Sequence, residues 1–231
     1  MKVKLSVIIP VYNEKNTILK IIEKVKKVPV EKEIIIVDDG SNDGTTEILK
    51  GIKEENIKVI FKDKNEGKGS AIREGLKYIT GDIIVIQDAD LEYDPNDWLK
   101  MLEVIKEKNA DIVFGSRILG KCKKSSFAFY YGGKFITFLT NILYGTKLTD
   151  GPTCYKMFKK DVIKNINLKC KRFEFCQEFT AKVRKLGYQI YEVPINYNPR
   201  SIKEGKKIRW KDGIEAIWTL IKYKFIKNGR K

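Results

Sequence analysis

The stretch Ile84-Val85-Ile86-Gln87-Asp88-Ala89-Asp90-Leu91 decides how this chain is interpreted, because an apolar run ends in two carboxylates that one small residue separates. The run predicts a buried β-strand, and the two carboxylates then lie at its carboxyl end. In open α/β sheets, ligands bind at that end of the strands. Two oxygen ligands there can hold a hard divalent cation, which can also bind a diphosphate. The stretch therefore predicts a cation site at the edge of a sheet.

The first 115 residues alternate short apolar runs with amphipathic segments of helical period. This alternation is typical of βαβ units around a mainly parallel sheet. The predicted strands are residues 5–9, 33–37, 57–61, 82–86 and 111–114, and the predicted helices are residues 15–27, 44–53, 68–79 and 96–108. The strands show almost no polar alternation, as expected where helices cover both faces of a sheet. We therefore predict an α/β fold.

Charge and composition limit the possible chemistry. The chain carries 46 Lys and Arg against 30 Asp and Glu, and its net charge of +16 attracts phosphorylated substrates, anionic lipids or nucleic acid. A lysine-rich solvated surface explains the same charge equally well. Because the chain has no His, any chemistry must use carboxylates, Lys, Arg and Tyr. The four Cys lack zinc-site spacing and predict reduced thiols in a cytosolic compartment.

Acidic residues also follow two other predicted strands, in Pro10-Val-Tyr-Asn-Glu14 and in Val37-Asp-Asp-Gly40. Carboxylates accept hydrogen bonds from hydroxyl groups but repel phosphate, so these segments suit a ribose and a base edge. Glu92 is spaced to add a third oxygen to Asp88 and Asp90, and an all-oxygen set favours Mg²⁺ or Mn²⁺. As the structural alternative, two aspartates at a strand end cap a helix or lie in a solvated loop.

Four segments together resemble one enzyme family: Ser6–Glu14, Ile36–Thr45, Gln87–Glu92 and Gly115–Arg117. They resemble family-2 inverting glycosyltransferases of the GT-A fold, and among these the dolichyl-phosphate mannose synthases and related polyprenyl-phosphate glycosyltransferases. The resemblance continues more loosely to about residue 215. It implies one GT-A domain over residues 1–231, with a nucleotide-sugar-binding half at 1–117 and an acceptor-binding half at 118–231.

The resemblance also implies roles for single residues. The nucleotide sugar would contact residues from three strand ends and one further arginine: Pro10, Tyr12, Glu14, Val37, Asp39, Asp88, Ala89, Asp90 and Arg117. Asp88, Asp90 and Glu92 would bind Mg²⁺ or Mn²⁺ on the diphosphate, although relatives often have Gln or a small polar residue at the position of Glu92. Catalytic roles would fall to Asp90, Arg117 and Asp150.

The acceptor phosphate would be held by Arg200, Lys206 and Lys207. The family pattern is an Arg, a Gly and a Lys, and this chain has one extra residue between Arg and Lys, so either lysine fits the role. In some family members an acidic group near Asp150 is proposed as a base. A phosphate acceptor needs none, because the second pKa of a phosphate monoester is about 6. Asp150 is then as well suited to orienting a loop or an arginine as to moving a proton.

Two stretches predict contact with a membrane surface. Residues 127–144 are rich in aromatic residues and weakly charged, and residues 209–227 place apolar residues at helical spacing among lysines. Packing of such helices on a core would produce the same pattern. No stretch is a convincing membrane span, and the amino-terminal apolar run is too short for a signal peptide. We expect a cytoplasmic enzyme, peripheral on the inner face of the cell membrane, with a homo-oligomer or a separate membrane subunit as further partners.

These observations predict transfer of a sugar from GDP-mannose or a UDP-sugar to a polyprenyl or dolichyl phosphate, with inversion and with a divalent metal. A transferase acting on a saccharide hydroxyl is the nearest alternative, and it would need a base such as Asp150. A basic nucleic-acid-binding protein would use the charge, but no known binding fold with interleaved aromatic and basic residues is visible, and we expect no nucleic-acid partner. A non-catalytic nucleotide-sugar binder is a third alternative, against which the intact acidic motifs argue.

Overall fold

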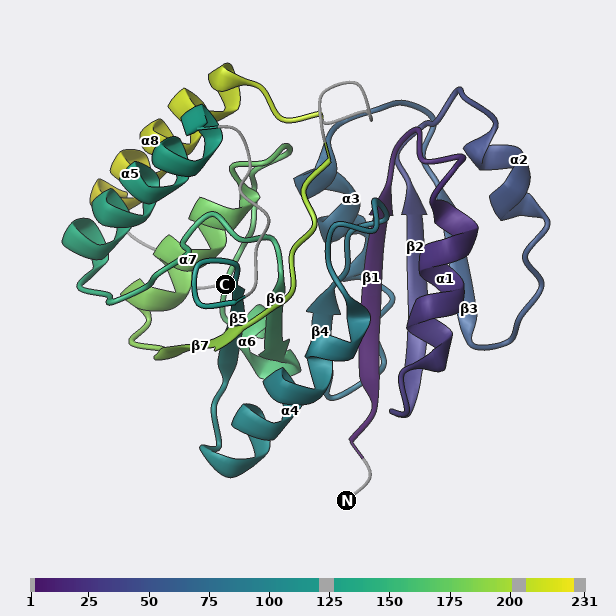
Figure 1. Ribbon diagram of the computed structural model, residues 1–231, viewed down its shortest axis with the longest axis horizontal. Helices are drawn as coiled ribbons and strands as arrows, with labels where there is room; N and C mark the ends of the chain where they lie inside the picture. Colours follow the sequence, from purple (N-terminus) through teal and green to yellow (C-terminus); the bar gives the residue numbers. More distant parts are fainter. Residues whose placement is uncertain (1–2, 121–126, 201–206, 227–231) are drawn as a thin grey trace.

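The computed structural model describes residues 3–120, 127–200 and 207–226. Within them, seven strands form one sheet in the order β3-β2-β1-β4-β6-β5-β7 (Figure 1). Their bounds are β1 (Leu5–Val11), β2 (Lys32–Asp38), β3 (Ile57–Phe61), β4 (Ile83–Ile86), β5 (Ile112–Ser116), β6 (Lys156–Lys159) and β7 (Ile190–Pro194). Neighbouring strands are parallel except where β6 pairs with β4 and β5. The predicted α/β fold with a mainly parallel sheet is confirmed.

Helices cover both faces of this sheet. Their bounds are α1 (Ile18–Lys27), α2 (Thr45–Lys50), α3 (Lys68–Gly75), the 3₁₀ turn η1 (Pro95–Asp97), α4 (Trp98–Glu107), α5 (Phe127–Tyr144), α6 (Lys160–Lys164), α7 (Phe175–Lys185) and α8 (Trp210–Phe225). One core lies between the sheet and α1 and α4, and a second lies between the sheet and α3, α6 and α7. In Figure 1, α5 and α8 lie side by side over α7, and a third apolar cluster joins these three helices.

Strand β1 shows why the apolar runs lack polar alternation. Val7 and Ile9 belong to the core with α1 and α4, whereas Ile8 belongs to the core with α3 and α7. Successive side chains of a strand point to opposite faces, so a strand that is buried on both faces is apolar throughout. The five strands predicted from these runs are present in the structure, with small differences at their ends.

The predicted helices are longer than those observed, for example at α3, which ends at Gly75 instead of residue 79. A Cβ at Gly75 would meet the Cγ2 atom of Ile8 at 2.8 Å, so the glycine lets this helix approach β1 closely. The antiparallel strand β6 was not predicted. It enters the sheet between β4 and β5 from a part of the chain far from both, and such pairing leaves no local pattern in the sequence.

Glu33 in β2 ties together the amino-terminal ends of the central strands. Its Oε1 accepts hydrogen bonds from the Ser6 hydroxyl at 2.6 Å and the Thr80 amide at 2.5 Å, and Oε2 accepts one from the Thr80 hydroxyl at 2.6 Å. Burial alone would raise the pKa of Glu33, but these hydrogen bonds outweigh burial and lower the pKa to about 2. The ionised carboxylate therefore stabilises the folded chain.

We expect Glu33→Gln to lower the melting temperature by about 3 °C at pH 7. Because the folded pKa of Glu33 lies below the usual 4.5, its stabilisation is complete above that value and is lost as the pH falls through about 2. Thermal unfolding followed between pH 7 and pH 2 should show the difference from the unmodified protein shrinking. Glu31→Gln, at an exposed neighbouring position, is the matched control. A difference that stays constant over this pH range would contradict the prediction.

Candidate functional site

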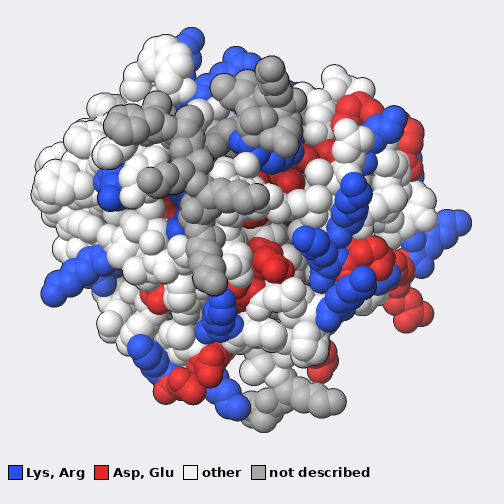
Figure 2. Space-filling model, viewed as in Figure 1, with Lys and Arg blue, Asp and Glu red and all other residues white. Residues whose placement is uncertain are grey.

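Three acidic segments leave the sheet at the same edge. Strands β2 and β4 both pair in parallel with β1, so their carboxyl ends lie beside one another. Residues 12–14 follow β1, Asp39 follows β2 and residues 88–90 follow β4 shortly after its last residue. Figure 2 shows acidic side chains gathered near the middle of the face that carries this edge. The sheet topology thus brings together the segments for which the sequence predicted a ligand site.

Arg200 connects two of these segments directly. Its Nη1 and Nη2 atoms donate to the two carboxylate oxygens of Glu14, each at 3.0 Å, and Nη2 also donates to Oδ2 of Asp90 at 3.0 Å. Lys207 donates to Oε1 of Glu14 at 2.7 Å and to the carbonyl oxygen of Tyr12. Burial alone would raise the pKa of Glu14, but Lys207 and Arg200 outweigh burial and lower the pKa. Two cations from the end of the chain therefore close over the strand ends.

Asp90 lies in a crowded set of carboxylates. Burial raises its pKa to about 7, together with the negative charges of Asp88 and Glu92. Across the residues that the structure describes, no three acidic or Cys side chains are arranged to hold a metal ion as they stand. Lys68 forms an ion pair with Asp88 at 2.5 Å, and Arg200 pairs with Asp90. The excess of negative charge at this site is thus balanced by the side chains of two cationic residues.

Two lysines of the site were missed in the sequence. Lys62 follows β3 and donates to Oδ1 of Asp39 at 2.5 Å, while the Gly67 amide donates to Oδ2 at 2.6 Å. Lys68 begins α3 and reaches Asp88. The only signal was their position, with Lys62 directly after β3 and Lys68 at the first residue of α3. In a chain with so many lysines, that signal does not distinguish them from solvated surface residues.

Arg117 and Asp150 form a two-pronged ion pair. The Nε and Nη2 atoms of Arg117 donate to the two Asp150 oxygens, each at 2.7 Å, and the Arg117 amide donates to Oδ2 at 3.0 Å. Asp150 is buried, and its own amide donates to Glu192 in β7. The guanidinium of Arg117 also lies over the ring of Tyr197 at 5.2 Å. Asp150 therefore orients Arg117, which is one of the two roles that the sequence left open for it.

Both carboxylate oxygens of Glu92 accept hydrogen bonds within the protein. Oε2 accepts one from the Tyr197 hydroxyl at 2.8 Å, and Oε1 accepts one from the Arg200 amide at 2.7 Å. The Glu92 carbonyl oxygen also accepts the Asn198 amide at 2.9 Å. Glu92 thus fixes the segment that carries Arg200 beside Asp90. The same segment places Tyr197 against Arg117. Contacts through this segment therefore connect the Arg117–Asp150 pair to Glu92 and Asp90.

The remaining predicted residues lie at the same strand ends. Pro10 of β1 is in register with Val37 of β2, and Val37 and Ala89 are buried. The ammonium group of Lys207 lies over the ring of Tyr12 at 5.7 Å. Lys206 falls outside the described residues. Apart from that lysine, the structure brings the residues predicted for donor, metal and acceptor into one connected group.

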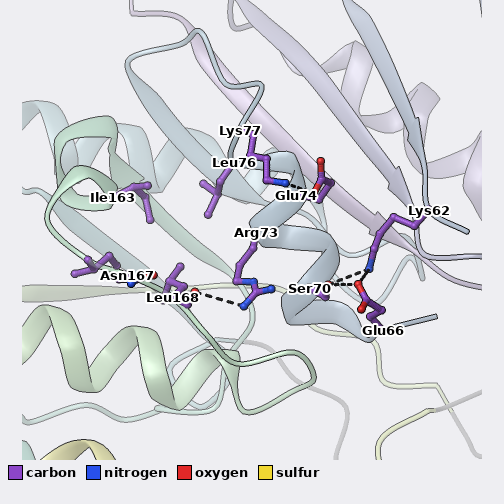
Figure 3. Close-up of a pocket in the computed structure, with 11 residues that line it drawn as sticks. Lys62, Glu66, Ser70, Arg73, Glu74, Leu76, Lys77, Ile163, Asn167 and Leu168 are labelled. Atoms are coloured by element: carbon purple, nitrogen blue, oxygen red, sulfur yellow. Dashed lines mark hydrogen bonds and ion pairs between the residues drawn. The ribbon is translucent and has the colours of Figure 1, made fainter. Parts of the chain in front are cut away.

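A separate cavity of about 550 Å³, which Lys62 also lines, lies between α3 and residues 163–168 (Figure 3). Its charged groups satisfy one another or the backbone. Lys62 pairs with Glu66 at 3.0 Å, Lys77 pairs with Glu74 at 2.6 Å, and Arg73 donates to the Lys169 carbonyl oxygen at 2.7 Å. The group at the strand ends, where like charges are crowded, is therefore the stronger candidate for a ligand site.

Comparison with protein families decides the assignment. The model of the family described as glycosyl transferase family 2 matches residues 6–166, a range that contains Glu14, Asp39, Asp90, Arg117 and Asp150. The chain belongs to glycosyl transferase family 2. It is an enzyme of the glycosyltransferase class, as the sequence motifs predicted, and the alternative of a nucleic-acid-binding protein is set aside.

Curated relatives carry names that agree with this class. The chain is 33% identical over 224 residues to the UDP-N-acetylglucosamine–dolichyl-phosphate N-acetylglucosaminyltransferase of Methanococcus voltae, a match that covers 87% of this chain and 89% of that protein. It is 29% identical over 202 residues to the low-salt glycan biosynthesis hexosyltransferase Agl6 of Haloferax volcanii, covering 85% of this chain. The match takes in 48% of Agl6, so the chain spans about half the length of that relative.

A solved structure supports the fold of this family 2 member. Glucosyl-3-phosphoglycerate synthase of Mycobacterium tuberculosis, in complex with Mn²⁺, uridine diphosphate and phosphoglyceric acid, superposes with a TM-score of 0.75. The match covers 98% of this chain and 80% of that chain at 17% identity. At this identity the likeness concerns the fold, and it confirms the predicted GT-A architecture.

Proposed function

We propose that this glycosyltransferase moves a sugar from a nucleotide-diphosphate sugar, GDP-mannose or a UDP-sugar, to the phosphate of a polyprenyl lipid, with inversion. The observation that carries the proposal is the position of Arg200, which contacts both Glu14 and Asp90. Arg200, which is expected to bind the acceptor phosphate, is thus hydrogen-bonded directly to carboxylates that are expected to bind the donor. The name of the Methanococcus voltae relative describes a transfer of this kind, and the match covers most of both chains.

Asp88 and Asp90, with Glu92 beside them, would hold Mg²⁺ or Mn²⁺. The fit rests on oxygen ligands and on the raised pKa of Asp90, which reflects its burial beside the carboxylates of Asp88 and Glu92. When bound, such a cation would neutralise the departing nucleotide diphosphate. The chain's own Lys68 and Arg200, which now pair with the two aspartates, would then be free to turn toward phosphate oxygens.

The remaining residues divide between the two substrates. Asp39, with Lys62 on one of its oxygens, would face the base and ribose of the donor together with Pro10, Tyr12, Glu14, Val37 and Ala89. Arg117, held by Asp150, would face the donor phosphates. In this proposal residues 1–117 bind the donor, and residues 118–231 of the same domain bind the acceptor.

A phosphate acceptor suits this site better than a saccharide hydroxyl. Both oxygens of Asp150 are bound to Arg117, so Asp150 is poorly placed to remove a proton from a hydroxyl. A phosphate monoester is largely dianionic at neutral pH and needs no base. Arg200 and Lys207, with Lys206 as the alternative lysine, would hold that dianion for attack on the anomeric carbon from the face opposite the leaving group.

The outer surface of α5 and α8 supports contact with a membrane. Figure 2 shows mostly uncharged side chains over these two helices. Large apolar side chains that are more than half exposed lie on both: Tyr131, Phe135, Phe138, Ile142, Trp210, Ile214, Trp218 and Phe225. No helix in the described part of the chain is both long and apolar enough to cross a bilayer. An interfacial position would bury these rings at headgroup depth, beside basic residues that attract anionic lipid.

We expect the double variant Phe138→Ser, Trp218→Ser to bind vesicles of anionic phospholipid at least about tenfold more weakly, because two exposed apolar side chains are removed. Turnover of a water-soluble short-chain prenyl phosphate should not change. Leu19→Ser, which removes a side chain that is 52% exposed on α1, is the matched control. Vesicle flotation measures the binding. Unchanged vesicle binding, or a stable dimer in which this face is covered by a second copy, would contradict the membrane assignment.

The proposed reaction is tested by combining GDP- and UDP-sugars with a polyprenyl phosphate and Mn²⁺, and by measuring product mass. A lipid-linked sugar phosphate is the expected product, formed in preference to products on free sugars or other saccharide hydroxyls. Transfer to saccharide hydroxyls without a lipid product would overturn the acceptor assignment and favour the alternative transferase. Nucleotide-sugar binding without turnover on either acceptor class would favour a non-catalytic binder.

A further inference from the structure

Two cysteine thiols meet beneath the donor site. The sulfur of Cys154, between the Asp150 loop and β6, lies 3.4 Å from the sulfur of Cys176, in the first turn of α7. Both thiols are free, Cys176 is 3% exposed and Cys154 is partly exposed. The glycosyl transfer described above uses neither thiol. Buried sulfurs at this distance need to approach by little more than 1 Å to reach the bond length of about 2.05 Å in a disulfide.

The Cys154 side of the pair leads directly to the segment proposed to bind the metal. The hydroxyl of the next residue, Tyr155, lies within hydrogen-bond distance of two acceptors, the side-chain oxygen of Gln87 at 3.1 Å and the carbonyl oxygen of Asp94 at 2.8 Å. Gln87 immediately precedes Asp88. A shift of Cys154 is therefore transmitted to both flanks of the segment that carries the aspartates.

The Cys176 side leads to the same place by another route. Two carbonyl oxygens in the loop before α7 accept hydrogen bonds from the start of α3. The Gly69 amide donates to the Arg172 carbonyl oxygen at 3.2 Å, and the Ser70 amide donates to the Lys171 carbonyl oxygen at 2.8 Å. Lys68, the residue before these amides, forms the ion pair with Asp88. The two sulfurs thus lie on segments that connect to Asp88 by two separate routes.

We propose that Cys154 and Cys176 form a reversible disulfide that lowers the transferase activity. A low-molecular-weight disulfide is the oxidant. The sulfur of Cys154, the more exposed of the two, attacks one sulfur of the oxidant, giving a mixed disulfide and releasing one small thiol. The Cys176 sulfur then attacks the Cys154 sulfur and releases the second small thiol. Two protein thiols lose two electrons and two protons, and the oxidant becomes two thiols.

The expected effect follows from geometry. Closing the gap between the sulfurs draws the Cys154 loop and the start of α7 together, which displaces Asp88 and Lys68 through the contacts described above. A displacement of about 1 Å in a positioned site can lower turnover by up to about a hundredfold. We expect a loss of at least about tenfold in nucleotide diphosphate release, restored by a dithiol reductant.

The test uses the full chain with Cys122→Ser and Cys170→Ser, so that only this pair remains. After incubation with oxidised glutathione, thiols are counted in denaturant, intact mass is measured and activity is assayed. The expected result is loss of both thiols, a mass lower by two hydrogen atoms, a monomeric product and the reversible loss of activity. Adding Cys176→Ser should leave a glutathione adduct on Cys154 and no internal disulfide.

Two results would overturn the proposal. In the first, Cys154 and Cys176 both remain thiols in the folded chain under oxidising conditions that form the disulfide in the unfolded chain. In the second, the disulfide forms while activity stays unchanged. If the serine replacements at 122 and 170 disturb folding, alkylation and peptide mapping of the unmodified chain give the same thiol readout. Thiol counting does not depend on which acceptor the enzyme uses, so a failure here is separate from a failure of the proposed reaction.

Discussion

Asp90→Asn is expected to lower sugar transfer by about a thousandfold, the largest effect of any single replacement in this site. Asparagine has nearly the same shape as Asp90 but lacks the negative charge that a divalent cation on the donor diphosphate requires. The Asp90 carboxylate also accepts the Glu92 amide at 3.1 Å, a contact that the asparagine side-chain oxygen can preserve. Release of nucleotide diphosphate, measured across a range of Mn²⁺ concentrations, gives the result.

Stability supplies a second measurement for Asp90 that does not depend on turnover. Burial and the neighbouring carboxylates raise the folded pKa of Asp90 to about 7, above the ordinary 3.8. Ionisation therefore costs stability, and the metal-free enzyme should lose stability as the pH rises from 3.8 through about 7. Asp90→Asn should remove this loss and should also reduce the stabilisation that Mn²⁺ provides. Asp161→Asn, on a side chain that is 80% exposed, is the control. Full activity of the Asp90→Asn enzyme would refute the proposed metal site.

Arg200→Gln is expected to raise KM for the lipid phosphate by about a hundredfold. The guanidinium now makes two hydrogen bonds to Glu14 and one to Asp90, and in the proposed reaction it exchanges them for the acceptor phosphate. Charged hydrogen bonds contribute about 1.5–3 kcal/mol each, so loss of the cation accounts for an effect of this size. Because Asp90 also loses a competing partner, the affinity for Mn²⁺ without acceptor should rise.

The two opposite effects of Arg200→Gln distinguish an acceptor-binding role from a structural one. Arg200→Lys should recover part of the acceptor affinity, because the charge remains but the two-pronged geometry is lost. Arg209→Gln, at an exposed position beside α8, is the control. Equal losses of acceptor binding, metal binding and melting temperature would instead show that Arg200 only holds the fold together.

Much of the sheet could be predicted because buried parallel strands carry their pattern locally. The strand β3 was predicted with the bounds that the structure shows, 57–61, since an apolar run between turn residues needs no distant partner to be visible. No such pattern marked Lys62 and Lys68 as residues of the site. Their importance comes from Asp39 and Asp88, which belong to other strand ends and meet these lysines only in the folded chain.

The amino-acid pattern alone was sufficient for the fold class and for the acidic residues at the strand ends, because strand periodicity and strand-end position are local properties. The partner of each acidic group required the three-dimensional arrangement. Glu14 and Arg200 are 186 residues apart in the sequence and form two hydrogen bonds, and the Asp150 carboxylate orients an arginine where the motif alone left a base equally open. Charges and thiols act over a few ångströms, and only chain folding determines which of them lie that close.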